Sequence, residues 1–218
     1  MNIKSIITTL EQLAPPSLQE SYDNSGLIVG DRNAEVTAAL LCLDSTEEVI
    51  DEAIQRNCGL VIAHHPIVFS GLKSLTGKNY IERTILKAIK NDIAIYAIHT
   101  NLDNVKNGVN KKIAEKIGLD NLQILSPKSG LLQKLVFFCP ISDSEKVKQA
   151  LFAAGGGTIG EYDCCSFSVE GSGTFRAGAN TNPYVGSKRE LHSEKEHRVE
   201  LIFPDYLKGN LLSALKST

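Results

Sequence analysis

Two adjacent histidines, His64 and His65, are the residues of this sequence best suited to chemistry. They follow the short apolar run 60–63, which is typical of a buried strand rather than a helix. Pro66 lacks a backbone N–H and biases His65 toward an extended conformation, so we expect the strand to end there. Because side chains alternate along a strand, two imidazoles at its end suit two neighbouring metal ions better than one ion. A hydrogen-bonded pair of histidines without a metal is the alternative at this point.

Two other apolar runs also end in polar residues. Run 36–43 ends at Asp44, and run 93–98 is followed by His99 and, four residues later, Asp103. Helical patterns of about a dozen residues separate the three runs, which predicts a parallel sheet with right-handed crossovers. Run 36–43 is almost wholly apolar and is therefore predicted to be a central strand. Ligands bind beyond the carboxyl ends of such strands, so this edge is the predicted metal site.

The roles of the other polar residues stay open on this pattern alone. Asp103 could bridge two ions through its carboxylate. His99 could be a metal ligand, an acid or base, or an orienting residue, and a capping or buried hydrogen-bonded imidazole is the alternative. Asp23 and Asn24 lie in a segment rich in turn formers, and we interpret them as turn stabilisers ahead of ligand-orienting residues.

The composition is that of an ordinary globular protein. The 218 residues are 42% hydrophobic and 22% charged, and the formal net charge of −2 argues against nucleic acid or an anionic membrane as a partner. No run is long enough to span a bilayer, and the first residues lack the apolar core of a signal peptide, so a cytoplasmic location is expected. The five cysteines include no C-x-x-C pair, which argues against a disulfide framework, and we assign them no function.

The pattern changes after about residue 130, which predicts a second domain. A strand, a helix, two more strands and a last helix are expected at 135–139, 143–154, 162–169, 197–203 and 206–215. This order suits a small ferredoxin-like α+β domain. The segment 171–196 is rich in glycine, asparagine, serine and charge and is predicted to be a long loop.

Several motifs together resemble the NIF3-like family, whose bacterial members are commonly described as GTP cyclohydrolase 1 type 2 homologues. The motifs are Tyr22-Asp23-Asn24-Ser25-Gly26-Leu27, Ala63-His64-His65-Pro66, Phe69-Ser70-Gly71-Leu72-Lys73 and His99-Thr100-Asn101-Leu102-Asp103. Residues 1–130 resemble the family's metal-site domain, and residues 131–218 resemble the PII/CutA-like domain inserted in its longer members. The resemblance implies an α/β fold with a mostly parallel sheet flanked by helices, plus the inserted ferredoxin-like domain.

The resemblance also implies two divalent metal ions, with His64, His65 and Asp103 as ligands and His99 moving protons. These donors are compatible with Zn, Mn, Fe or Co. The family further implies a toroidal homo-hexamer and a small nucleotide-like substrate.

A C-terminal His-x-x-x-Glu motif completes the family's site, and this chain is expected to end at Thr218 before it. His192 and Glu196 have the same spacing, but they lie in a charged stretch of the inserted domain and are interpreted as a solvated face.

The function predicted on these grounds is a metal-dependent hydrolase in which two ions activate water. Lys73, in the loop after the histidine pair, could contact a substrate phosphate. A metal-dependent phosphoesterase and a non-catalytic metal-binding or regulatory scaffold are the alternatives.

Overall fold

The structure, a computed structural model, describes all residues from 1 to 218 and divides into two compact units. The first unit is Met1–Lys128 and the second is Ser129–Thr218. Each unit has its own hydrophobic core. None of the helices combines the length and the apolar character that crossing a membrane requires.

The first unit is built on a mixed four-stranded sheet. Its strands, in the order β1-β4-β3-β2, are β1 (Gly26–Val29), β4 (Ala94–Ala97), β3 (Leu60–His65) and β2 (Ala39–Asp44). β2, β3 and β4 are parallel, as the sequence predicted, whereas β1 pairs with β4 in the antiparallel direction. The carboxyl ends of β2, β3 and β4 therefore lie at one edge of the sheet.

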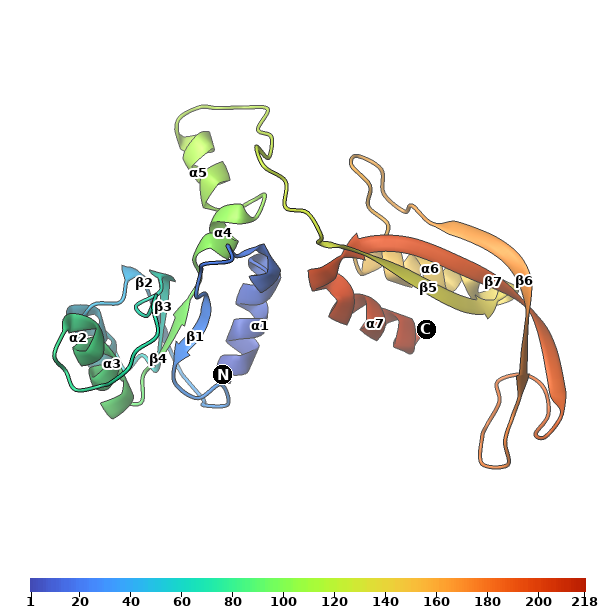
Figure 1. Ribbon diagram of the computed structural model, residues 1–218, viewed down its shortest axis with the longest axis horizontal. Helices are drawn as coiled ribbons and strands as arrows, with labels where there is room; N and C mark the ends of the chain where they lie inside the picture. The colour runs from blue at the N-terminus through green and yellow to red at the C-terminus, as the bar shows by residue number, and fades with distance from the viewer. The chain divides into compact units, whose positions relative to one another are not determined.

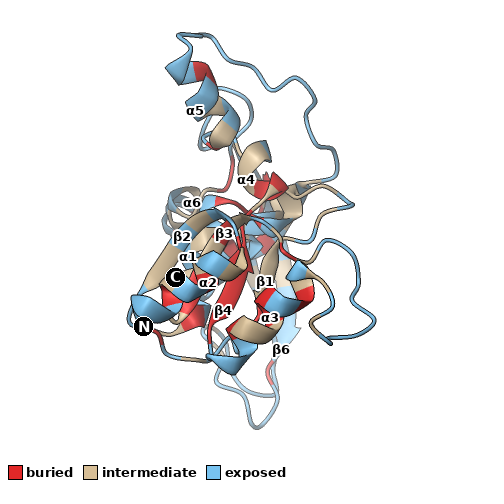
Figure 2. Ribbon diagram, turned by 90° about the vertical axis from the view of Figure 1, so that its left-hand side faces the viewer, coloured by how far each residue is buried: buried red, intermediate tan, exposed pale blue.

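Helices cover both faces of this sheet (Figure 1). Ile3 and Ile7 of α1 (Ile3–Leu13) pack on one face against Tyr96 of β4. α2 (Glu47–Gln55) and α3 (Tyr80–Lys90) pack on the other face. β4 is buried along its whole length between the two helical layers, as Figure 2 shows. Because the strands β3 and β4 lie in the middle of the sheet, they hold the residues at and after their carboxyl ends in place.

Local signals in the sequence fix the helix ends. Thr46 caps α2, and its hydroxyl accepts a hydrogen bond from the backbone N–H of Val49 at 3.3 Å.

After β4 the chain enters α4 (Thr100–Asn104) and then α5 (Val109–Lys116). The N-terminal helix is followed by the short 3-10 helix η1 (Pro16–Leu18).

The prediction of a central position for the strand at 36–43 is wrong. β2 lies at the edge of the sheet, and Leu41 and Leu43 are exposed. Leu40 and Cys42, on the opposite face, pack against the core formed with α2 and α3. The apolar run predicts burial on both faces, but on the face of Leu41 and Leu43 only Ala39 packs against a core of this unit.

The second unit is a three-stranded antiparallel sheet with two helices. Its elements are β5 (Leu132–Pro140), η2 (Ile141–Asp143), α6 (Ser144–Ala153), β6 (Phe167–Arg176), β7 (Leu191–Pro204), η3 (Asp205–Leu207) and α7 (Lys208–Ser217). The strand order is β5-β7-β6. Leu151 of α6 and Leu211 of α7 pack in one core with Val199 and Leu201 of β7.

The prediction of a long loop at 171–196 is wrong for the two ends of that segment and right for its middle. The ends of that segment are strand, since β6 continues to Arg176 and β7 begins at Leu191 and residues 171–176 pair with 191–196, so only 177–190 form the loop between the two strands. The predicted strand at 162–169 correspondingly begins only at Phe167. The extended part of this hairpin is polar on both faces, so it lacks the hydrophobic alternation by which a strand is recognised in a sequence.

Candidate metal centre

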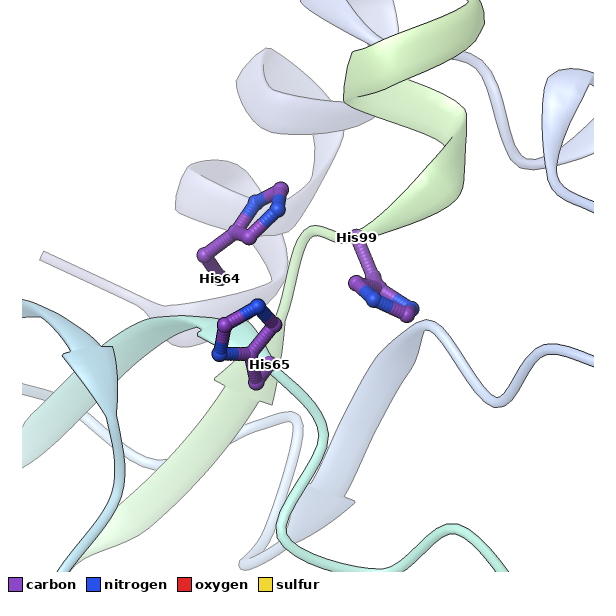
Figure 3. Close-up of side chains that lie close together, drawn as sticks. All are labelled: His64, His65 and His99. Atoms are coloured by element: carbon purple, nitrogen blue, oxygen red, sulfur yellow. The ribbon is translucent and has the colours of Figure 1, made fainter. Parts of the chain in front are cut away.

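Three histidines meet at the carboxyl edge of the sheet in the first unit. His64 and His65 end β3, and His99 directly precedes α4. β3 and β4 are parallel neighbours, with Ala63 opposite Ala97, so the residues after them emerge side by side. One ring nitrogen from each histidine lies within 4.8 Å of the others. Figure 3 shows the three rings grouped around a common space.

Each imidazole has an oxygen acceptor at Nδ1. The pairs are His64 with the backbone carbonyl of Ile98 at 2.9 Å, His65 with Asp44 at 2.8 Å and His99 with Asp23 at 2.8 Å. Because these oxygens accept, Nδ1 of each ring carries a proton, which leaves Nε2 as the nitrogen that could bind a metal. Metal-binding histidines are held in this way in many proteins.

Asp23 is the most firmly held of the acceptors. Its side chain is 0% exposed, and it accepts hydrogen bonds from the backbone N–H of Asn24 at 2.6 Å, the hydroxyl of Ser25 at 2.9 Å and the backbone N–H of Thr100 at 3.1 Å. Burial by itself raises the pKa of Asp23, but hydrogen bonds from Thr100, His99 and Ser25 bring the pKa well below its ordinary value of 3.8. Asp23 therefore faces His99 as an ionised carboxylate at neutral pH.

Asp44 holds His65 in a more open setting. It is the last residue of β2, directly opposite His65 in the parallel pair. The side chain of Asp44 is 60% exposed. Solvent therefore competes for this carboxylate, and the orientation of His65 is less tightly fixed than that of His99.

Asp103 lies next to the histidines on α4. One of its carboxylate oxygens is 3.8 Å from Nε2 of His64. The structure thus brings together all four residues that the sequence singled out: His64, His65 and Asp103 as predicted ligands and His99 as the predicted proton carrier. A ring nitrogen of His99 belongs to the same close group as those of His64 and His65, so its position is that of a third possible ligand. The assignment of ligand and proton-carrier roles stays a prediction.

Sequence reasoning missed two contacts of this site. Asp23 was interpreted as a turn stabiliser, yet it also holds His99; its place in a motif shared with the NIF3-like family was the available signal. No sequence signal points to the carbonyl of Ile98, because its role depends on the orientation of a ring. His192 belongs to β7 of the second unit, where it forms a 2.9 Å contact with Glu194.

The segment between β3 and α3 is fixed by a buried carboxylate. Glu82 of α3 accepts hydrogen bonds from the backbone N–H and hydroxyl of Thr76, both at 2.9 Å, and from the backbone N–H groups of Gly77 and Lys78 at 3.0 and 3.2 Å. These bonds, chiefly that of the Thr76 N–H, lower the pKa of Glu82 to about 2. The loop that follows the histidine pair is thereby tied to the core.

These features define an α/β protein with a candidate metal centre at the carboxyl edge of a mixed, largely parallel sheet. Residues 1–198 match the family model for Duf34/NIF3 (NGG1p interacting factor 3), and the chain belongs to this family. The family assignment made from the sequence motifs is thus confirmed.

Relatives and a solved structure agree with this assignment. The chain is 40% identical over 215 residues to the "GTP cyclohydrolase 1 type 2 homolog" of Halalkalibacterium halodurans, and 38% identical over 216 residues to that of Bacillus subtilis. These matches cover 98% and 99% of this chain and 58% of each relative. A Bacillus cereus protein related to NIF3 has a crystal structure that matches with a TM-score of 0.82 and 40% identity, over 100% of this chain and 58% of that one. The chain therefore spans a little over half the length of these relatives.

Proposed function

We propose that this chain binds divalent metal at the histidine cluster and acts as a metal-dependent hydrolase on a nucleotide-like substrate, resembling GTP cyclohydrolase 1 type 2. The observation that carries the proposal is the set of three ring nitrogens, one from each histidine and within 4.8 Å of one another, on rings that oxygen acceptors hold at Nδ1. The names of the relatives support the substrate class.

The residues present fit a metal ion. Neutral imidazoles with a fixed Nδ1 proton are common ligands, and Asp103 adds a carboxylate 3.8 Å from His64. This donor set is compatible with Zn, Mn, Fe or Co. We further propose two ions, with Asp103 as a shared ligand. A bound divalent ion would supply Lewis-acid chemistry and make water a stronger nucleophile near neutral pH.

The chain's own residues have separate tasks in this proposal. Asp23 keeps the ring of His99 in one orientation, with Nε2 directed away from the carboxylate. If His99 is not a ligand, its Nε2 can take up or release a proton, and the negative charge of Asp23 stabilises the imidazolium that forms. Lys73 is exposed in the loop after β3 and can contact a substrate phosphate.

Metal binding and turnover test the proposal on the full chain. Bound metal is measured by mass spectrometry of the purified protein and by calorimetric titration with Zn²⁺ and Mn²⁺, and GTP consumption is then followed with each ion. We expect His64→Ala to lower metal affinity at least tenfold and to abolish turnover. His192→Ala is the matched control, because it removes a histidine of the second unit. Unchanged metal content and turnover in His64→Ala would contradict the proposal.

A non-catalytic metal-binding scaffold is the second candidate. The three imidazoles are close together and Asp103 lies 3.8 Å from His64, and a metal site closed by protein ligands alone is typical of structural rather than catalytic metal. Bound metal without turnover of GTP or of p-nitrophenyl phosphate would favour the scaffold. Turnover of the phosphoester alone would favour a phosphoesterase.

The proposal extends to assembly and location on the strength of the family resemblance. We propose that the protein forms a homo-hexamer, that the second unit is a PII/CutA-like domain and that the protein works in the cytoplasm. The β-α-β-β-α order of the second unit supports the domain assignment. Light scattering coupled to size-exclusion chromatography tests the assembly, since a hexamer has six times the mass of the chain.

A further inference from the structure

Two exposed aromatic rings lie beside the histidine cluster. Tyr22 is 66% exposed and Phe69 is 52% exposed, and their ring centroids are 6.4 Å apart. Phe69 also meets His99 nearly at a right angle, with centroids 6.3 Å apart. One exposed aromatic side chain is ordinary on a protein surface, but two neighbouring rings at the rim of a polar site indicate a recognition surface. Tyr22 and Phe69 are called the aromatic pair below.

The backbone beneath the aromatic pair is held in place. The side-chain amide of Asn24 donates a hydrogen bond to the carbonyl of Val68 at 2.7 Å, which joins the loop of Tyr22 to the loop of Phe69. The N–H of Glu20 donates to the hydroxyl of Thr100 at 2.9 Å, which fixes the first loop to α4. The rings are therefore presented by ordered loops although neither ring is buried, an arrangement that lowers the entropic cost of binding a ligand.

We infer that the aromatic pair stacks a planar heteroaromatic ring, such as a nucleobase, of the substrate. Aromatic side chains bind such rings through their faces, and stacking requires no particular hydrogen-bond pattern. A ring held at Phe69 lies beside His99, so the rest of the molecule can reach the histidine cluster. The inference rests on the proposed function and adds to it the side chains that select an aromatic substrate.

Binding of guanosine and of inorganic tripolyphosphate separates recognition of the ring from recognition of phosphate. Calorimetric titration of the full chain is expected to give guanosine binding that weakens about 5- to 100-fold in Tyr22→Ala and in Phe69→Ala. Phe69→Tyr keeps a ring and should retain binding. Metal content and tripolyphosphate binding should not change in any of these variants, since none of them removes a candidate ligand.

A fluorescent variant provides a second readout. The chain contains no tryptophan, so Phe69→Trp places a single reporter in the aromatic pair, and guanosine should quench it. Tyr80→Trp is the control, because Tyr80 is an exposed residue at the start of α3 that no ring contact joins to the pair. Quenching in Phe69→Trp alone supports the inference.

Three results would overturn the inference. They are no binding of guanosine by the unmodified chain, binding that is unchanged in both alanine variants, and alanine variants that lower the molecular mass in light scattering while guanosine binding persists. The last result would mean that another copy of the chain covers the rings. Failure of the proposed function is distinguishable, because it appears as absence of metal or of turnover and not as a loss confined to the aromatic variants.

Discussion

The carboxylate of Asp23 lies 2.8 Å from Nδ1 of His99, although the two residues are 76 positions apart in the sequence. Asp23 is fully buried and is also held by Asn24 and Thr100, so its position does not depend on a bound ion. The ring of His99 is thereby oriented in advance, with Nδ1 held by the carboxylate. Removing such an outer partner typically costs 10- to 100-fold in metal affinity.

Asp23→Asn is therefore expected to weaken Zn²⁺ binding by about 10- to 100-fold in calorimetric titration. The amide can still approach His99, but it lacks the charge that stabilises the ring. Asp51→Asn is the matched control, because Asp51 of α2 forms an ion pair with Lys87 of α3 and contacts none of the three histidines. Equal affinities in the two variants would show that Asp23 does not position a ligand.

Asp44→Asn tests how much burial contributes to this positioning. Asp44 contacts His65 at the same 2.8 Å, but its side chain is largely exposed. Because water can replace an exposed carboxylate as the acceptor, we expect a loss of less than about tenfold in Zn²⁺ affinity. The same titration checks this prediction, and a loss as large as that of Asp23→Asn would refute the argument from burial.

The location of the site was predictable because it follows from topology. Apolar runs separated by helical patterns predict parallel strands, and the residues after parallel strands meet at one edge. His64, His65, His99 and Asp103 were found by this route. The pairing of Asp23 with His99 does not follow from strand order, because Asp23 lies in a turn before β1 and reaches the ring through the packing of its loop on α4, and only its place in the family motif marked it.

The two errors in the predicted fold have a common cause. The hydrophobic pattern of a sequence indicates which residues are buried, but it does not indicate which strands pair. β2 is apolar on both faces but leaves Leu41 and Leu43 uncovered on one of them, so its sequence predicted a central strand. The outer part of the β6-β7 hairpin is paired but polar, so its sequence predicted a loop. Backbone pairing without burial leaves little trace in a single sequence.

The exposure of β2 leads to a prediction about stability. Leu41 is 75% exposed, so Leu41→Ser should change the free energy of unfolding by less than about 0.5 kcal/mol. Ile50 of α2 is fully buried in the core, and Ile50→Ala should cost about 2 to 5 kcal/mol. Urea denaturation of both variants measures the difference. A large loss in Leu41→Ser would mean that another polypeptide segment covers this face of β2 in solution.

The ionisation of Glu82, which holds the loop after the histidine pair, makes the stability of the folded chain depend on pH. Its buried carboxylate accepts hydrogen bonds from the backbone of Thr76, Gly77 and Lys78, which lower its pKa from 4.5 to about 2. A carboxyl whose pKa is lowered on folding stabilises the folded state above pH 4.5 and loses this contribution as the pH falls toward 2. Glu82→Gln should therefore be less stable than the unmodified chain at pH 7, and the difference should narrow at pH 3.

Urea denaturation of both proteins between pH 7 and pH 3 measures this narrowing. Glu52→Gln is the control, because Glu52 forms an exposed ion pair with Arg56 on α2, and its removal should cost less than about 1 kcal/mol. A difference between Glu82→Gln and the unmodified chain that is as large at pH 3 as at pH 7 would show that the charge of Glu82 does not hold the loop. In that case the loss would come from a hydrogen-bond mismatch, because an NH₂ group in place of Oε1 of Glu82 would face the side-chain NH₂ of Asn79, which donates to that oxygen.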